Sequence, residues 1–484
     1  MAAMHRRRFL SISALSAAAF SPASRLLAQS APLPVHVSIG GPTGRLIAED
    51  FTGLSYESAQ LSDPDFFSSG NDQLSDLMAG LGKRGVLRIG GNTSEYCFWK
   101  ADPKAHTVAG EAAATQGGAI GPDQGQAAPQ RRVISEQAIH NLKSFLDRLP
   151  GWTLIYGLNL GLGTPEMAAD EAAYVSRVMG DRLLAFQMAN EPDVFFSNGL
   201  RPSSYNGQQF IEEWARFFKA VRRRVPHAPF AGPDTAYNNE WLVPFARAFR
   251  NDLKFVSSHY YAEGPPTDPA MTLARLLRPD PKLESEFAGL EQVKRETGLP
   301  FRLAETNSCY HGGKEGVSNT FAAALWAADY MFRIAQAGGI GVNFHGGGYG
   351  IYTPIAGTRA NGFQARPIYY GMLLFREAAI GGQLLQVNPS TVPDGLRLYA
   401  VKRPDGRTTL TVLNLSLEHP VTLTVGSAFK GKRLIRMLAP NVSATTGETL
   451  GGAAISNRGA WHARRMETAG SILDLPPASA ALVG

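Results

Sequence analysis

Residues 183–191, LLAFQMANE, decide the fold that we expect for this chain. The segment is apolar almost without interruption and then ends abruptly in Asn190 and Glu191. A strand that is apolar on both faces is typical of a parallel sheet with helices on both sides. We therefore interpret residues 183–191 as a buried parallel strand whose polar end lies where such strands usually carry functional residues.

Seven other short apolar segments occur between residues 50 and 350. They are GLSYES (53–58), VLRIGGN (86–92), WTLIYGLNLG (152–161), PFAGPDT (229–235), FVSSHYY (255–261), FRLAETN (301–307) and IGVNFHGG (340–347). Amphipathic segments lie between them, such as residues 208–221 and 321–339, in which large apolar side chains recur at helical spacing. Eight such units predict an α/β fold, a (β/α)8 TIM barrel over residues 51–362. A doubly wound open sheet is the alternative.

The C-terminal region, residues 363–484, has a different pattern. LRLYAVKRPDGRTTLTVLNLS (396–416) holds two alternating strands joined by a Pro-Asp-Gly turn, and no convincing helix follows residue 363. We predict an all-β domain here, most simply a sandwich. PVHVSIGG (34–41), in the N-terminal segment 31–50, is expected to add a strand to it.

The first 30 residues have the parts of an export signal. HRRRFL supplies positive charge, SISALSAAAF is apolar, and RLLAQSAP offers a cleavage site. RRRFL (6–10) resembles the twin-arginine consensus, which implies export of a folded protein, most simply to a bacterial periplasm, and no membrane anchor in the mature protein.

Charge and cysteine content argue against other classes of protein. The signal carries four arginines and no acidic residue, so its removal lowers the formal net charge from +6 to +2 and leaves no basis for nucleic-acid binding. Two cysteines in the whole chain, Cys97 and Cys309, do not make a disulfide framework, and we predict free thiols.

Polar residues gather at the predicted strand ends, which share one face of a barrel. The set is Glu57, Asn92, Asn159, Asn190, Glu191, Asp234, His259, Tyr260, Tyr261, Glu305 and His345. Glu191 and Glu305 stand out because each closes an otherwise apolar strand. Glycoside hydrolysis needs two carboxyl groups across a cleft, about 5–5.5 Å apart for retention and about 6.5–9.5 Å for inversion. Two structural carboxylates in ion pairs are the alternative.

Other chemistries find little support. His259, His311 and His345 could reach the same face, but the chain has no HxH or HExxH pair, so we predict no metal site and no cofactor. GGGYG (346–350) lacks the Lys and Ser or Thr of a phosphate-binding loop, and GLGTPE (161–166) lacks the third glycine of a dinucleotide-binding turn. No GxSxG elbow for a serine hydrolase occurs.

Five segments in this order, GLSYES, LRIGG, ANEPD, ETNSCYHGG and GGYGIY, together resemble glycoside hydrolase family 79, which contains the heparanases and β-glucuronidases. The resemblance covers the chain after the signal and is greatest to bacterial exo-acting β-glucuronidases. It implies that Glu191 is the general acid/base and Glu305 the nucleophile of a retaining mechanism. It also implies that Asn190 contacts the 2-hydroxyl of the sugar and that Tyr261 contacts the nucleophile.

The resemblance further implies how a uronic acid is bound. Tyr310, Tyr352 and Gly350 are expected to hold the substrate carboxylate through hydroxyls and main-chain donors. Glu57 and Asn92 are expected to face the ring hydroxyls, and Tyr237 completes the expected substrate contacts. The chain lacks the long linker and basic stretches of heparanase, which favours a short substrate with a terminal glucuronate, including 4-O-methylglucuronate.

Two other functions stay open from the sequence. One is a related barrel glycosidase that acts on a neutral β-glycoside, because no cationic clamp for a carboxylate is evident. The other is a carbohydrate-binding protein without catalysis, although carboxylates at both strand ends argue against it.

Overall fold

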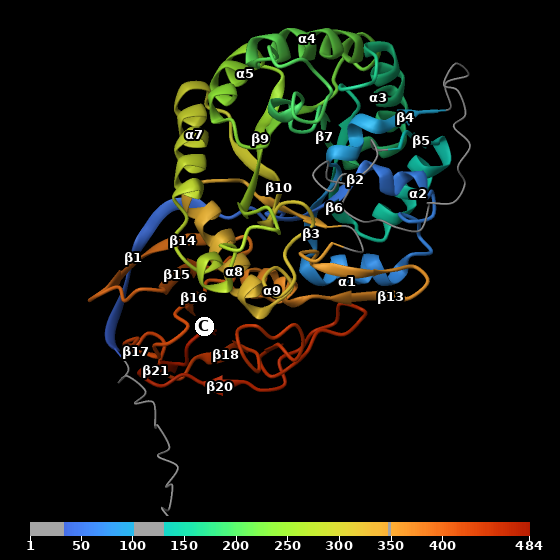
Figure 1. Ribbon diagram of the computed structural model, residues 1–484. Coiled ribbons are helices and arrows are strands. Elements are labelled where there is room, and N and C mark those ends of the chain that lie inside the picture. Colours follow the sequence, from blue (N-terminus) through green and yellow to red (C-terminus); the bar gives the residue numbers. More distant parts are fainter. Residues whose placement is uncertain (1–32, 101–129, 347–349) are drawn as a thin grey trace, which may run out of the picture. The chain divides into compact units, whose positions relative to one another are not determined.

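Eight parallel strands close into a barrel in the computed structural model, which describes residues 33–100, 130–346 and 350–484 (Figure 1). The strands are β2 (Thr52–Glu57), β3 (Arg84–Gly90), β6 (Gly151–Leu158), β7 (Leu183–Met188), β8 (Phe230–Thr235), β9 (Leu253–Glu263), β10 (Phe301–Cys309) and β11 (Val342–Gly346). Their order around the barrel is β10-β11-β2-β3-β6-β7-β8-β9. All eight predicted strands are confirmed, and closure of the sheet excludes the doubly wound alternative.

Helices cover the outside of the barrel (Figure 1). They are α1 (Asp72–Leu81), α2 (Glu136–Asp147), α3 (Pro165–Met179), α4 (Gly207–Arg224), α5 (Leu242–Ala248), α6 (Leu273–Leu276), α7 (Pro281–Thr297), α8 (Phe321–Ala337) and α9 (Pro367–Ala379). The two helices predicted in most detail are confirmed as α4 and α8. Asn206 caps α4 by accepting from the N–H groups of Gln208 and Gln209. Helix α8 ends at Gly338, whose φ of 85° suits a glycine.

The expectation that no helix follows residue 363 was wrong, because α9 occupies Pro367–Ala379. This helix packs against α8 and α1 and so belongs to the outer layer of the barrel. Its sequence, PIYYGMLLFREAA, is buried on nearly every side. Its apolar run IYYGMLLF (368–375) is short and rich in aromatic residues, and periodicity alone does not distinguish such a run from a buried strand.

Ten of the other strands form a mixed sheet that curls around its own core. We call this unit the β-domain. It comprises β1 (Leu33–Leu46), β14 (Gln383–Pro389), β15 (Leu396–Lys402), β16 (Thr408–Asn414), β17 (Val421–Thr424), β18 (Arg433–Leu438), β19 (Thr449–Leu450), β20 (Glu467–Thr468), β21 (Ile472–Leu475) and β22 (Ser479–Val483). Strand β1 pairs antiparallel with β14 and parallel with β17, so the N-terminal segment contributes a strand. An α/β barrel followed by an all-β domain is confirmed.

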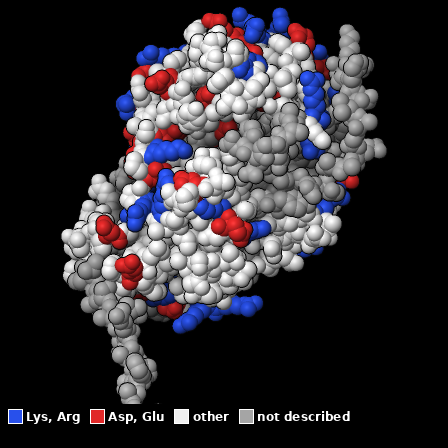
Figure 2. All heavy atoms as spheres, in the orientation of Figure 1, with Lys and Arg blue, Asp and Glu red and all other residues white. Residues whose placement is uncertain are grey.

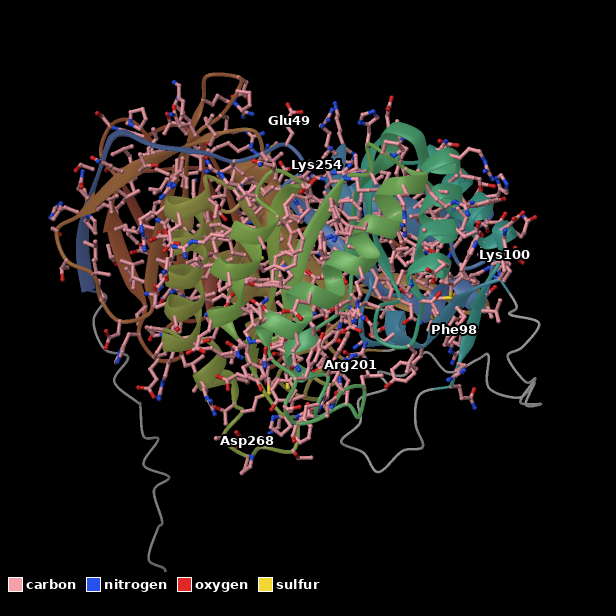
Figure 3. All side chains as sticks on the ribbon, turned by 90° about the horizontal axis from the view of Figure 1, so that it is seen from above. Glu49, Phe98, Lys100, Arg201, Lys254 and Asp268 are labelled. Atoms are coloured by element: carbon pink, nitrogen blue, oxygen red, sulfur yellow. The ribbon has the colours of Figure 1, made fainter. Side chains whose placement is uncertain are left out.

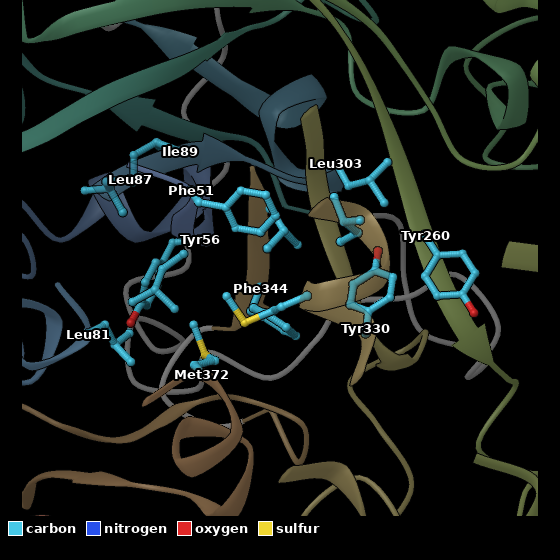
Figure 4. Packing of buried hydrophobic residues seen from close by; sticks show 14 of the residues in the cluster. Phe51, Tyr56, Leu81, Leu87, Ile89, Tyr260, Leu303, Tyr330, Phe344 and Met372 are labelled. Carbon is cyan, nitrogen blue, oxygen red and sulfur yellow. The ribbon is translucent and has the colours of Figure 1, made fainter. Parts of the chain in front are cut away.

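The barrel and the β-domain share a continuous apolar core. Phe344 of β11 and Met372 of α9 belong to it (Figure 4). The ring of Phe332 on α8 stacks on Tyr399 of β15 at 4.3 Å, and the Tyr399 hydroxyl donates to Asp329. Two short two-stranded sheets lie outside both units: β4 (Cys97–Trp99) with β5 (Arg132–Ile134), and β12 (Ile355–Thr358) with β13 (Gly362–Ala365).

A layer of apolar side chains fills the barrel beneath the site. It consists of Val86, Ile155, Ala185, Ala231 and Phe255, from five strands. Two residues further along β3, β7 and β9 come Arg88, Gln187 and Ser257, which also point inward because side chains of a strand alternate. A polar layer therefore lies on top of the apolar one, toward the C-terminal ends of the strands.

Three sequence predictions concern features away from the site. Both cysteines are buried free thiols, as expected. Among the described residues, no helix has the length and apolarity needed to cross a membrane. The export signal (1–30) lies outside the described residues, so the signal stays a prediction.

Candidate active site

Glu191 and Glu305 face one another at the C-terminal end of the barrel. Glu191 follows β7, whereas Glu305 lies within β10. One carboxylate oxygen of Glu191, one of Glu305 and a ring nitrogen of His259 all lie within 4.8 Å of one another. The structure thus brings together the two carboxyl groups that the sequence singled out, although 114 residues separate them in the chain.

Glu305 is buried among groups that favour its charged form. Its Oε2 accepts from Arg88 Nη1 at 2.6 Å, and its Oε1 accepts from the Tyr261 hydroxyl at 2.7 Å. Burial by itself raises the pKa of this carboxyl. The surrounding cations, His345 first and then His259 and Arg88, outweigh that effect and hold the pKa of Glu305 well below its usual range.

The surroundings of Glu191 favour its protonated form instead. Its side chain is 12% exposed, and its Oε1 lies 2.9 Å from Nδ1 of His259. Burial raises the pKa of Glu191 above its ordinary value, and the charge of Glu305 adds to the rise. The hydrogen bond and the charge of His259 offset this only in part. A group that tends to keep its proton therefore faces a group that tends to keep its charge.

A strained turn presents Glu191 to the site. Ala189 and Glu191 have positive φ values of 83° and 52°, a conformation that costs roughly 1–3 kcal/mol per non-glycine residue. Two hydrogen bonds hold the turn: Glu191 N–H donates to the Asp234 carbonyl at 2.9 Å, and Asn190 N–H donates to Glu95 Oε1 at 2.7 Å. Pro192 then begins a short 3-10 helix, η5 (Pro192–Val194), which leads the chain away from β7.

Glu95 is a buried carboxyl that the sequence did not reveal. It lies in the 3-10 helix η2 (Asn92–Tyr96) after β3 and ties three strand ends together. Besides Asn190, it accepts from the N–H groups of Leu160 and Gly161, which follow β6. Burial raises its pKa to about 7, against the lowering effect of these donors. The only signal was an acidic residue in the otherwise uncharged stretch GGNTSEYCFW (90–99).

Arg88 is the centre of the site and was also missed. Its guanidinium donates to the Glu305 carboxylate, to Asn190 Oδ1 at 2.7 Å and to Asp234 Oδ2 at 2.8 Å. Its Nε donates to Gln187 Oε1 at 2.9 Å. The signal for Arg88 was a lone charge inside an apolar strand, VLRIG, but nothing in the sequence indicated its partners.

Buried charges in the site balance. Although burial lowers the pKa of His259, the carboxylates of Glu305 and Asp234 outweigh it and raise that pKa to about 10. Burial raises the pKa of Asp234, but Arg88 and His259 together bring it below its ordinary value. Arg88 and His259 therefore face the carboxylates of Asp234 and Glu305, and His345 lies between Glu305 and the Glu57 carboxylate. Glu191 is the member of this group whose environment favours the protonated form.

Glu191, His259 and Glu305 also have the spacing of a three-ligand metal site. A protonated imidazole has no free lone pair for a metal, and the Arg88 guanidinium already bonds Glu305. The charges of these side chains thus favour proton transfer over metal binding.

The residues expected to face ring hydroxyls lie beside this cluster. Asn190 Nδ2 donates to Asn92 Oδ1 at 3.1 Å. The Glu57 carboxylate, a quarter exposed, accepts from the N–H and hydroxyl of Thr93. Gly91, at φ 74°, is needed here because a Cβ would come within 2.5 Å of the Glu57 carboxylate.

The loops after β10 and β11 carry the residues expected to bind a uronate. Tyr352 is buried, with its ring 6.2 Å from that of Tyr261 and 6.1 Å from that of His345. The Gly350 carbonyl accepts from Thr353 N–H, so these residues form a tight turn. Tyr310 follows β10 and is half-buried. Residues 347–349 of this loop lie outside the described residues.

Three other residues lie outside the cluster: the predicted substrate contact Tyr237 and the strand-end residues Tyr260 and Asn159. Tyr237 is 63% exposed in the loop after β8. Tyr260 points out of the barrel and stacks on Tyr330 of α8. Asn159 Oδ1 accepts from the N–H groups of Leu162 and Gly163, which is a structural role.

Comparisons with known proteins relate the whole chain to glycoside hydrolases. No protein-family model matches the chain. A β-glucuronidase of Aspergillus niger is 26% identical over 88% of this chain and 83% of that protein. Mouse heparanase is 24% identical over 78% of this chain and 77% of that protein. The chain is thus a distant homologue of glycoside hydrolases, the β-glucuronidases and heparanases, and the resemblance to glycoside hydrolase family 79 is supported at that level.

Solved structures share the fold. A 4-O-α-L-rhamnosyl-β-D-glucuronidase from Fusarium oxysporum 12S superposes with a TM-score of 0.70 and 18% identity, covering 93% of this chain and all of that one. A family 51 arabinofuranosidase from Xanthomonas axonopodis pv. citri superposes with a TM-score of 0.63 and 15% identity, covering 93% of this chain and 99% of that one. At such identities the likeness establishes the fold alone.

Proposed function

We propose that the protein is a retaining exo-β-glucuronidase, which hydrolyses terminal β-linked glucuronate or 4-O-methylglucuronate from a glycoside or polysaccharide. One observation carries the proposal: an oxygen of Glu191, whose pKa is raised, lies within 4.8 Å of an oxygen of Glu305, whose pKa is lowered. Inverting glycosidases separate the pair by about 6.5–9.5 Å to admit a water between carboxylate and sugar, whereas retaining ones need about 5–5.5 Å.

In the proposed mechanism Glu305 attacks the anomeric carbon while Glu191 protonates the departing oxygen. A covalent glucuronyl ester on Glu305 results. Glu191, now a carboxylate, takes a proton from water, which attacks the same carbon and releases Glu305. Arg88 and Tyr261 hold the attacking carboxylate by hydrogen bonds.

Asn190 is proposed to bind the 2-hydroxyl of the sugar. Its Oδ1 is occupied by Arg88 and one N–H of Nδ2 by Asn92. An amide nitrogen has two N–H groups, so the second is left for the substrate. A hydrogen bond to the 2-hydroxyl strengthens as the oxocarbenium-like transition state forms.

For the uronate carboxylate we propose the hydroxyls of Tyr310 and Tyr352 and the main chain at Gly350. Arg88, the one arginine beside the catalytic pair among the described residues, already bonds two carboxylates of the protein. It is therefore engaged within the protein, and neutral donors are the better candidates for the substrate. The similarity to β-glucuronidases supports this substrate class. Acidic and basic side chains are interspersed over the face in Figure 2, which suits a short substrate better than an extended polyanion.

Rates on four substrates test the proposal. We expect an aryl β-glucuronide to be hydrolysed with a kcat/KM at least tenfold above those of the β-xyloside, β-glucoside and β-galacturonide with the same leaving group. For the xyloside and the glucoside, which lack the carboxylate, the size follows from pairing one buried carboxylate with its donors, about 1.5–3 kcal/mol. The galacturonide carries the same carboxylate and differs in the orientation of its 4-hydroxyl, so its rate tests the contacts to that hydroxyl. A faster neutral glycoside would overturn the glucuronidase assignment in favour of a related glycosidase. Proton NMR of the first product should show the β-anomer, and an α-anomer would contradict retention.

A plot of kcat/KM against pH should be bell-shaped. Activity is lost on the acid side as Glu305 is protonated, below its ordinary pKa of 4.5, and on the alkaline side as Glu191 is deprotonated, above 4.5. His259 lowers both pKa values, so His259→Gln should move both limbs to higher pH. His140→Gln, which removes a histidine bonded to Tyr174, is the control. If neither limb of the pH profile moves in His259→Gln, the proposed effect of His259 on the two pKa values is wrong.

A further inference from the structure

Exposed apolar side chains of the barrel gather at one part of its mouth. Between residues 47 and 346, within the described ranges, four large apolar side chains are exposed: Val133, Leu162, Phe196 and Tyr237. Leu162, Phe196 and Tyr237 each follow the C-terminal end of a strand, and those strands, β6, β7 and β8, are consecutive in the barrel. Val133 lies in β5, in the connection from β3 to α2. Single exposed apolar residues are common, but three on consecutive loops of one face mark a binding surface.

These three loops lie at the functional end of the barrel. Figure 3 shows Arg201 and Asp268, from loops that follow β7 and β9, at one end, and Glu49 and Lys254, from the strand starts, at the other. Arg201 belongs to the same loop as Phe196. The exposed apolar side chains therefore belong to the end that carries Glu191 and Glu305.

Hydrogen bonds fix three of the loops to one another. Arg201 Nη1, from the loop after β7, donates to the Gly161 carbonyl in the loop after β6 at 2.8 Å. Asp193, also after β7, accepts from the N–H groups of Ala236 at 2.8 Å and Tyr237 at 3.1 Å, after β8. The loops that carry Leu162, Phe196 and Tyr237 are thus connected by hydrogen bonds. We call these three side chains the apolar rim.

The position of the apolar rim relative to Glu191 indicates which part of the substrate the rim binds. Asp193 and Phe196 follow Glu191 by two and five residues. A general acid must lie beside the oxygen of the departing group. The residues proposed for the uronate lie instead on the loops after β10 and β11. Whatever is attached to the glucuronate therefore extends over the loops of β6, β7 and β8.

We propose that the apolar rim binds the leaving group, and that this group has a flat apolar face, either an aryl ring or the apolar face of a sugar. The inference rests on the proposed function and deepens it, because it names the chemistry of the aglycone. Tyr and Phe offer large rigid surfaces for such faces, with little loss of side-chain freedom.

Leaving groups of different shape test the rim. kcat/KM is measured for wild type and for Phe196→Ala, Tyr237→Ala and the double variant, on methyl, 2-naphthyl and xylosyl β-glucuronides. Met466→Ala is the matched control, since Met466 is as exposed as Tyr237, at 63%, but lies in the β-domain. Because kcat/KM reports the step in which the leaving group departs, the ratio of variant to wild type isolates aglycone contacts.

We expect each aromatic substitution to reduce kcat/KM on the ring-bearing substrates by about two- to tenfold more than on the methyl glucuronide. A selective loss on the naphthyl substrate identifies an aryl aglycone, and one on the xylosyl substrate a sugar. Equal ratios on all three substrates would overturn the rim as an aglycone site. A wild type that hydrolyses none of them would instead overturn the proposed glucuronidase function.

Discussion

Glu305→Gln is expected to reduce kcat/KM for an aryl β-glucuronide by about 10⁴-fold or more, because an amide cannot form the glycosyl ester. The substitution preserves the size of the side chain and an oxygen that can accept from Arg88 or Tyr261, so the fold should be retained. A 2-fluoro-glucuronide that traps the intermediate should add one sugar mass to the wild type at Glu305 and none to the variant. Peptide mass spectrometry identifies the labelled residue.

Glu171→Gln is the matched control for Glu305→Gln. Glu171, on α3, is just as buried, and burial raises its pKa to about 8, so an amide replaces a neutral acid that bonds Tyr156. This variant should keep activity within a few fold of wild type. Appreciable turnover by Glu305→Gln, or a label on another carboxylate, would refute the assignment of the nucleophile.

The fold was predictable from the sequence because burial on both faces leaves a clear pattern. Residues 183–188 and 301–304 are apolar with few interruptions, and each run is followed by Glu191 or Glu305 at the end where a barrel carries its site. Helix α9 was not predicted, because its buried sequence has an ambiguous pattern. It is enclosed between the barrel and the β-domain, and its short apolar run IYYGMLLF (368–375) is as typical of a buried strand as of a helix.

The pair of carboxyl groups was predictable, but their supporting residues were not. Position in the chain marked Glu191 and Glu305, whereas the roles of Arg88 and Glu95 depend on partners far away in sequence. Arg88 meets Asp234 after 146 residues and Glu305 after 217. A lone arginine in a strand has the same local pattern wherever its partners are. Arg302, in FRLAETN, points instead toward the strand starts, where it bonds Asn343 and the carbonyl of Phe51.

The opposite pKa shifts of Glu191 and Glu305 also follow from contacts between residues that are distant in the sequence. Both catalytic candidates are buried glutamates, and burial alone would raise both pKa values. The difference is that three cations, His345, His259 and Arg88, lower the pKa of Glu305, whereas His259 alone lowers that of Glu191. Tyr261 adds a hydrogen bond to Glu305. The arrangement of cations and donors around each carboxyl therefore separates acid from nucleophile, and no single segment of the sequence contains that arrangement.

Glu191→Gln is expected to lose activity in proportion to how much the leaving group needs a proton. On an alkyl or sugar glucuronide, kcat/KM should fall by about 10²–10⁴-fold, the usual contribution of a general acid. On a dinitrophenyl glucuronide, whose phenolate leaves without a proton, the loss in kcat/KM should be less than tenfold. The alkaline limb of the pH profile, which we assign to Glu191, should disappear with the substitution.

Chemical rescue separates loss of the acid from loss of structure. In Glu191→Ala, azide has room to reach the glucuronyl ester on Glu305, and because no general base remains to activate water, the anion should accelerate turnover of the dinitrophenyl substrate. Attack from the face that the leaving group vacated gives the β-glucuronyl azide, which NMR distinguishes from the α-form. An equal loss on all leaving groups, an α-azide, or rescue at Glu305→Gln and not at Glu191→Ala would each contradict the role given to Glu191.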